Sequence, residues 1–167
     1  KLDLRYAVIT SVDRDDLIDG GAEHWVKTIQ FIRSKCPKMK IETLIPDFQG
    51  NTNLVEKICK AEPDVLAHNL ETVESLQSRL RPQCRYTWSL DTLRTAAAKK
   101  NLIVKSSLML GLGEKEEEVV HSMKDLVSAG CQILSLGQYL RPSPRHLEVV
   151  EFIHPDKFSE YKEIGES

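Results

Sequence analysis

Polar side chains follow or interrupt five short apolar runs of this sequence, and their types suit the binding of a polar small molecule. Hydroxyl, amide and carboxylate groups can hold hydroxyl or amino groups, while ammonium and guanidinium groups can hold an anion. A lysine inside an aliphatic run, such as Lys105, is costly to bury unless an anion meets it. No Ser/His/Asp order or metal-ligand spacing accompanies these residues, so they name no reaction by themselves. The candidates are Thr10, Ser11, Asp13, Arg14, Asn69, Glu71, Lys105, Gln138 and Arg141.

Several neighbouring features have both a binding and a structural interpretation. The glycine pair Gly20-Gly21 could offer backbone N–H groups to an anion, or Asp19 could simply cap the helix that follows. The motif Gly111-Leu112-Gly113 is a weak phosphate-loop signal and also suits a tight turn. His68 is expected to be a packed side chain, and the acidic run 114–118 to be favourable charge at a helix start.

Four cysteines occur singly, at Cys36, Cys59, Cys84 and Cys131. No CxxC or CxxxC pair is present, so the sequence gives no support for a local zinc or iron–sulfur site. Scattered cysteines of this kind are typical of small buried residues in a reducing compartment.

The elements that must position the candidates alternate along the chain. The apolar runs 4–10, 40–45, 64–68, 103–110 and 132–136 are rich in Val, Ile and Leu, as are strands buried in a parallel sheet. Helical spacing predicts helices over 21–36, 54–61, 115–129 and 156–164, and Gly130 is expected to stop the third of these. The connection 72–101 contains Pro82 and should break into two helices.

The alternation predicts an α/β fold of about five βα units in one domain over residues 1–167, a partial (β/α) TIM-type barrel or a doubly wound sheet. A complete eightfold barrel needs about 250 residues, so the 167 here read like a stretch of a longer polypeptide. A net charge of −2 argues against a general nucleic-acid surface, and no apolar run is long enough to span a membrane.

The same segments resemble the lipoyl synthase family of radical S-adenosylmethionine enzymes. The matching strings run collinearly through the chain: VITSVDRDDLIDGGAEH, IPDFQGN, DVLAHNLETV, KSSLMLGLGEKEEEV, ILSLGQYLRPSPRHL and IHPDKF. The resemblance implies a partial barrel that binds S-adenosylmethionine and two 4Fe-4S clusters. In that family one cluster splits S-adenosylmethionine to a deoxyadenosyl radical, and the other donates two sulfurs to a protein-bound octanoyl chain, forming the lipoyl cofactor.

The resemblance also assigns roles to the candidate residues. Thr10 and Ser11 lie where the superfamily binds the methionine amino group. Asn69 and Glu71 match ribose or amino-acid contacts, Lys105 the methionine carboxylate and Gln138 the adenine or ribose side. The residues implied for substrate positioning are Asp13, Arg14 and Arg141.

The sequence departs from the family pattern where the clusters are held. The CxxxCxxC motif, the N-terminal cysteine trio and the terminal RSSY motif do not occur in these residues. We therefore expect that this chain alone assembles neither cluster, and that exposed sheet edges give it marginal stability or self-association.

The expected partners in the complete enzyme are octanoylated lipoyl carrier domains and an electron donor protein. The carriers implied are dehydrogenase E2 subunits and the glycine-cleavage H protein, and the implied location is the cytoplasm, or a mitochondrion or plastid in a eukaryote. Two alternatives remain at the level of sequence: a cluster-free nucleotide-binding module, or a fragment without activity.

Overall fold

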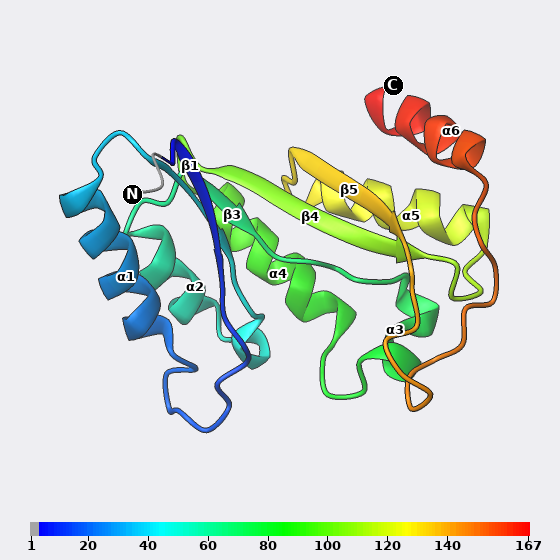
Figure 1. The fold of residues 1–167 in the computed structure, drawn as a ribbon, viewed down its shortest axis with the longest axis horizontal. Coiled ribbons are helices and arrows are strands. Elements are labelled where there is room, and N and C mark those ends of the chain that lie inside the picture. The colour runs from blue at the N-terminus through cyan, green and yellow to red at the C-terminus, as the bar shows by residue number, and fades with distance from the viewer. Residues whose placement is uncertain (1–3) are drawn as a thin grey trace.

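The computed structural model describes residues 4–167, which form five parallel strands separated by helices (Figure 1). Within these residues, no helix combines the length and the apolar character needed to cross a membrane. The strands are β1 (Tyr6–Thr10), β2 (Lys40–Leu44), β3 (Val65–Ala67), β4 (Ile103–Leu110) and β5 (Ile133–Gln138). The helices are α1 (Ala22–Lys35), η1 (Phe48–Gly50), α2 (Thr52–Cys59), α3 (Glu74–Leu80), α4 (Tyr86–Ala97), α5 (Glu116–Ser128) and α6 (Pro155–Glu166).

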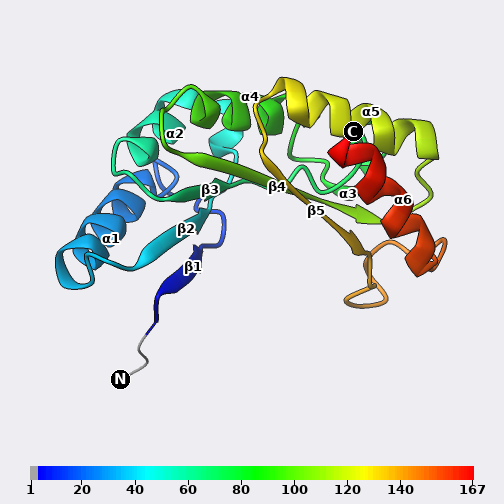
Figure 2. The same cartoon turned by 90° about the horizontal axis from the view of Figure 1, so that it is seen from above.

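The strands follow one another across the sheet in chain order, β1-β2-β3-β4-β5, and every neighbouring pair is parallel. Figure 2 shows the sheet as an open arch, with α2, α4 and α5 along its convex side. This arrangement is the partial TIM-type barrel that the alternation predicted. It leaves β1 and β5 as edge strands.

Alternation along each strand separates two faces of the sheet. In β4 the residues with even numbers are buried and those with odd numbers are half-buried or exposed. The even-numbered residues pack under the helices together with side chains of β2 and β3. This set includes Ile41, Leu66, Val104 and Leu108, each 0–1% exposed.

The opposite, concave face remains partly open and carries apolar residues at its edges. Tyr6, Val8, Ile103 and Ile133 are 46%, 59%, 40% and 43% exposed. The registers of Val8 with Glu42 and of Lys105 with Ile133 place all four on this face. The concave face is the surface on which the candidate site must be sought.

The expected elements are present, with small shifts at their ends. The connection 72–101 breaks into α3 and α4 on either side of Pro82, and Gly130 follows α5 with a φ of 82°. The strand expected at 132–136 extends to Gln138. The short turn η1, with positive φ at Phe48 and Gln49, was not predicted.

Candidate functional site

Lys105 lies near the centre of the concave face and is paired with a carboxylate of the chain itself. Its Nζ donates to Oε1 of Glu42 over 2.8 Å, and the hydroxyl of Tyr6 donates to Oε2 of the same carboxylate over 2.5 Å. Glu42 is 5% exposed. The anion that a half-buried Lys105 requires is therefore already present in the sheet.

The hydrogen-bonding partners of Glu42 change the ionisation of this group. Burial raises the pKa of the Glu42 carboxyl, but the hydrogen bonds from Lys105 and Tyr6 outweigh burial and leave that pKa below its ordinary value. Burial of the phenol, together with its hydrogen bond to Glu42, raises the pKa of Tyr6 to about 12. At neutral pH, Glu42 is thus an anion and Tyr6 a neutral donor.

The bonded side chains of Glu42 and Lys105 cross over β3, since β2 and β4 flank that strand. Glu42 is in register with Val65, whereas Lys105 is in register with Ala67, two residues further along β3. The ammonium group of Lys105 therefore reaches back, away from the carboxyl ends of the strands. Val65 and Ala67 beneath the pair are only 5% and 3% exposed.

Thr10 shares the face and the register row of Lys105. The row runs from Thr10 through Leu44 and Ala67 to Lys105, three strand spacings, which is about 14 Å between Cα atoms. Thr10 and the following Ser11 are exposed at the end of β1. Their hydroxyl groups are open to a ligand that lies across the carboxyl ends of the strands.

Asn69 and Glu71 lie together beyond the end of β3, as their spacing predicted. The side-chain amide of Asn69 donates to Oε1 of Glu71 over 3.2 Å, and both residues are half-buried. The backbone of Glu71 has a φ of 71° and bridges to β4, donating to the Ser107 carbonyl and accepting from Met109 N–H. This bridge, whose partner in β4 is Leu108, fixes the amide–carboxylate pair at the rim formed by the carboxyl ends of the strands.

Gln138 does not join this group, and the expectation that it faces the same cavity is wrong. It has the same parity as Leu134 and Leu136 in β5, which pack against the core, and so it lies on the helix-facing side. Its amide donates to the carbonyl groups of Tyr139 and Glu151, and its Oε1 accepts from Ile153 N–H over 2.8 Å. Gln138 holds the segment that leads into α6.

Asp13 and Arg14 lie in the loop after β1 and line a polar cavity of about 630 Å³. The cavity also contacts Asp47, Cys84 and Trp88, so it sits between this loop, η1 and the start of α4. The guanidinium of Arg14 is engaged by Asp16 in two hydrogen bonds of 2.7 Å.

Arg141 does not line that cavity, and its side chain bonds to residues of its own loop. Its guanidinium donates to the carbonyl groups of His146 and Pro144 and pairs with Glu148 at 3.2 Å. The structure thus does not bring Arg141 to the cavity of Asp13 and Arg14. Its three contacts stabilise the turn over residues 141–148.

The structural interpretations of three other motifs are confirmed. The carboxylate of Asp19 accepts from the N–H groups of Gly21 and Glu23, and the N–H of Gly20 donates to the Leu17 carbonyl, so both glycine N–H groups have partners within the chain. Glu114 accepts from the N–H groups of Gly111 and Leu112 and closes the turn after β4. His68 is packed, with Nδ1 donating to the Ile45 carbonyl and Nε2 bonded to the Ser89 hydroxyl.

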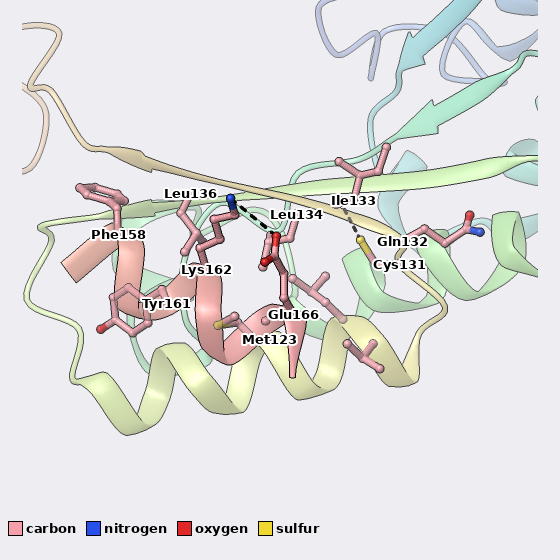
Figure 3. Close-up of a pocket in the computed structure, with 13 residues that line it drawn as sticks. Met123, Cys131, Gln132, Ile133, Leu134, Leu136, Phe158, Tyr161, Lys162 and Glu166 are labelled. Atoms are coloured by element: carbon pink, nitrogen blue, oxygen red, sulfur yellow. Dashed lines mark hydrogen bonds and ion pairs between the residues drawn. The ribbon is translucent and has the colours of Figure 1, made fainter. Parts of the chain in front are cut away.

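A second cavity, of about 500 Å³, lies between α5, β5 and α6 and is mainly apolar (Figure 3). Met123, Leu134, Leu136 and Tyr161 are among its lining side chains. None of the predicted site residues reaches it.

The cysteines of this chain do not fit an iron–sulfur cluster. Among residues 4–167 no group of three His, Cys, Asp or Glu side chains could hold a metal ion. Cys59 is buried, Cys36 is exposed, and Cys84 and Cys131 are half-buried at separate places. Burial raises the pKa of Cys59 and of Cys84 to about 11, which disfavours the thiolate form that binds iron.

The concave face and its rim, in contrast to the cysteines, carry donors and acceptors of the kinds that a zwitterionic ligand such as S-adenosylmethionine requires. Lys105 has three N–H groups and donates one to Glu42, while Thr10 and Ser11 offer hydroxyls and Glu71 a carboxylate. Sequence reasoning missed Glu42 and Tyr6. The signal for Glu42 was a glutamate inside the run 40–45, the acid partner that an embedded lysine requires.

Comparisons with known proteins agree with this architecture. The profile of the Radical SAM superfamily matches residues 1–126. Lipoyl synthase of Caldicellulosiruptor bescii is 52% identical over 165 residues, 98% of this chain and 57% of that protein. Lipoyl synthase of Oleidesulfovibrio alaskensis is 50% identical over 99% of this chain and 56% of its own length. A mitochondrial lipoyl synthase of Schistosoma mansoni is 49% identical over 99% of this chain and 43% of its own length.

This chain therefore spans little more than half the length of these bacterial relatives. Among solved structures, methylornithine synthase superposes with a TM-score of 0.76 over 96% of this chain and 48% of its own, at 14% sequence identity. That likeness supports the fold. Together, the parallel sheet and the matching profile show that the chain belongs to the radical SAM superfamily.

Proposed function

We propose that this chain is the barrel core of a lipoyl synthase, which inserts two sulfur atoms into a protein-bound octanoyl-lysine to form the lipoyl cofactor. The observation that carries the proposal is a sequence identity of 50–52% with two lipoyl synthases over nearly the whole chain. The alternatives, a cluster-free nucleotide-binding module and an inactive fragment, have no specific observation in their favour.

Within this core, the concave face holds S-adenosylmethionine. Lys105 receives the carboxylate of the methionine part, Thr10 and Ser11 its amino group, and Asn69 with Glu71 the ribose or amino-acid contacts. When bound, S-adenosylmethionine supplies the radical that removes hydrogen from the octanoyl chain. Gln138 has no part in this site, because its amide is occupied by the segment 151–153. Asp13 and Arg14 position the octanoylated carrier from the cavity beside the rim.

The iron–sulfur clusters are held by other parts of the complete polypeptide, two 4Fe-4S clusters in all. The thiols of residues 4–167 do not form either site. An electron donor protein supplies the reducing electron, and the carriers are octanoylated E2 subunits and the glycine-cleavage H protein. We also propose that the enzyme is located in the cytoplasm. Residues 1–167 form a single domain in this proposal.

The first experiment tests the binding site in the chain as it is. Isothermal titration calorimetry with S-adenosylmethionine is expected to give a single-site isotherm. Lys105→Met should weaken binding about tenfold, since a charge-assisted hydrogen bond to the carboxylate is lost. Lys100→Met, which changes an exposed lysine in the turn after α4, is the matched control and should leave the isotherm unchanged.

The second experiment tests the reaction. The chain is joined to the flanking segments of the Caldicellulosiruptor bescii relative, reconstituted anaerobically with iron and sulfide, and given a reductant and an octanoylated H protein. The expected product is the carrier carrying two additional sulfur atoms, detected by mass spectrometry. A colourless protein that leaves the octanoyl group unchanged contradicts the proposal.

A further inference from the structure

Glu42 is a buried anion on the same face as the proposed ligand. It is already paired with Lys105, the lysine proposed to bind the carboxylate of that ligand. Its side chain is 6% exposed, and both oxygens have donors, Lys105 on one and Tyr6 on the other. The Lys105 side chain is 31% exposed. Of the two charged groups, Glu42 is therefore the fixed one and Lys105 the one that can move.

The register determines the direction in which Lys105 points. Glu42 is two residues behind Lys105 along the sheet, since it pairs through Val65 with Ile103. Asn69 is two residues ahead, because it follows Ala67, the register partner of Lys105. The ammonium group that bonds Glu42 thus points away from the rim where Asn69 and Glu71 lie. A ligand carboxylate at the rim must draw Lys105 forward or share it with Glu42.

Either route brings the charge of Glu42 into the binding equilibrium. If Lys105 moves forward, the buried Glu42 loses its counter-ion and keeps only the phenol of Tyr6. If Lys105 is shared, two carboxylates lie within reach of one ammonium group and repel each other in a poorly solvated place.

We propose that Glu42 is a resident competitor for Lys105, which weakens the binding of carboxylate-bearing ligands at the concave face and so sets their affinity. This inference rests on the proposed function, because it takes S-adenosylmethionine as the ligand. Tyr6 has a supporting role: its hydrogen bond stabilises Glu42 when Lys105 leaves, and so moderates the competition.

The test compares two ligands that differ in one group, S-adenosylmethionine and its decarboxylated analogue, on the intact chain by calorimetry. Glu42→Gln should bind S-adenosylmethionine about tenfold more tightly than the unchanged chain does, with no such gain for the analogue. Tyr6→Phe should act in the opposite direction and weaken only S-adenosylmethionine. It also replaces Glu42→Gln as the test if that variant does not fold, because Tyr6 lies half-exposed on an edge strand.

Asp64→Asn is the matched control. Asp64 is a second ion-paired carboxylate of the sheet, bound to Lys40 and Arg33 and not to Lys105. Its loss should change the affinities for both ligands by the same factor. A spectroscopic reading comes from the ring carbon of Tyr6 that bears the hydroxyl, whose ¹³C resonance should move on adding S-adenosylmethionine and not on adding the analogue.

The outcomes separate the two proposals. If the unchanged chain binds S-adenosylmethionine but Glu42→Gln binds it equally or more weakly, Glu42 positions Lys105 and the competition is overturned while the site stands. An equal gain for both ligands also overturns it. If neither the unchanged chain nor Glu42→Gln binds S-adenosylmethionine, the proposed site fails and the competition fails with it.

Discussion

His68 is an ionisable side chain that the fold keeps neutral. It is 2% exposed, and Ile45 and Ser89 satisfy its two ring nitrogens at 2.8 and 2.9 Å. Burial lowers the pKa of this imidazole. The Ile45 carbonyl requires a proton on Nδ1, so the neutral ring has a lone pair on Nε2, to which the Ser89 hydroxyl donates.

Because only the unfolded chain takes up a proton at His68, stability should fall as the pH falls below about 6.5, the ordinary pKa of histidine. The expected slope from this residue is at most about 1.4 kcal/mol per pH unit. Urea denaturation between pH 8 and pH 5 measures it. His68→Asn should remove this contribution to the slope. An unaltered pH dependence in that variant would contradict a neutral His68.

Ser89→Ala tests the same site from the other side. It leaves Nε2 of His68 buried without a donor, which should cost about 1–2 kcal/mol of unfolding free energy at pH 8. Ser78→Ala, at an exposed position of α3, is the control and should change the stability by less than about 0.5 kcal/mol.

At the scale of elements, the ends of the strands are tied by side chains of neighbouring segments. Asp64, just before β3, accepts from the N–H of Ile41, from Lys40 at 2.8 Å and from Arg33 of α1. Gln138, the last residue of β5, fastens residues 151–153 and thereby the start of α6. These side chains join α1 and the segment 151–153 to the sheet.

Asp64 should make the protein sensitive to acid in a defined window. Burial raises the pKa of this carboxyl, but the bonds from Lys40, Ile41 and Arg33 outweigh burial and hold it at about 2. The stabilisation, about 2 kcal/mol, is present above pH 4 and is lost as the pH falls from 4 towards 2. Asp64→Asn should lose it at neutral pH as well. Denaturant unfolding at pH 7 and across this acid range measures both effects.

Gly111→Ala should loosen α6. Gly111 has a φ of 99°, and a Cβ there would lie 2.4 Å from both the Gln138 amide nitrogen and the Glu151 carbonyl oxygen. The strain should cost about 1–3 kcal/mol and speed hydrogen exchange over residues 150–166. Gly137→Ala is the matched control, since a Cβ at Gly137 would meet nothing within 4 Å. Equal exchange rates in the two variants would contradict the anchoring role of Gln138.

The sequence predicted the elements well because their signals are local. Apolar runs, Pro82 and Gly130 act within a few residues of themselves. Local signals could not predict the pairing of Glu42 with Lys105. The two residues are 63 positions apart in the chain, and they meet only because their strands flank a third strand. The helix-facing position of Gln138, in contrast, could have been read from its parity with Leu134 and Leu136. The positive φ of Phe48 and Gln49 in η1 has no local sequence signal.

At the scale of the whole molecule, the arch has an open apolar concave face and two edge strands. Val8 belongs to the edge strand β1, and its side chain is exposed on the concave face. Exposed edges and apolar surface of this kind promote association. The expectation of self-association stays a prediction.

Sedimentation velocity over a range of concentrations should show reversible association of the chain. Val8→Lys should reduce it, because a charge on an edge strand opposes pairing with another edge. Phe31→Lys, which changes a residue of α1 that is 64% exposed, should leave the association unchanged. A monomer at all concentrations would show that the open face does not drive association.

The strand order has a consequence for how the protein forms. Each strand pairs with the strand that precedes it in the chain, so every new βα unit adds to an edge that already exists. Sequential pairing keeps contacts short in sequence and allows folding to proceed from the N-terminal units while the rest is being synthesised. On the ribosome, β4 would therefore deliver Lys105 to a sheet in which Glu42 is already in place.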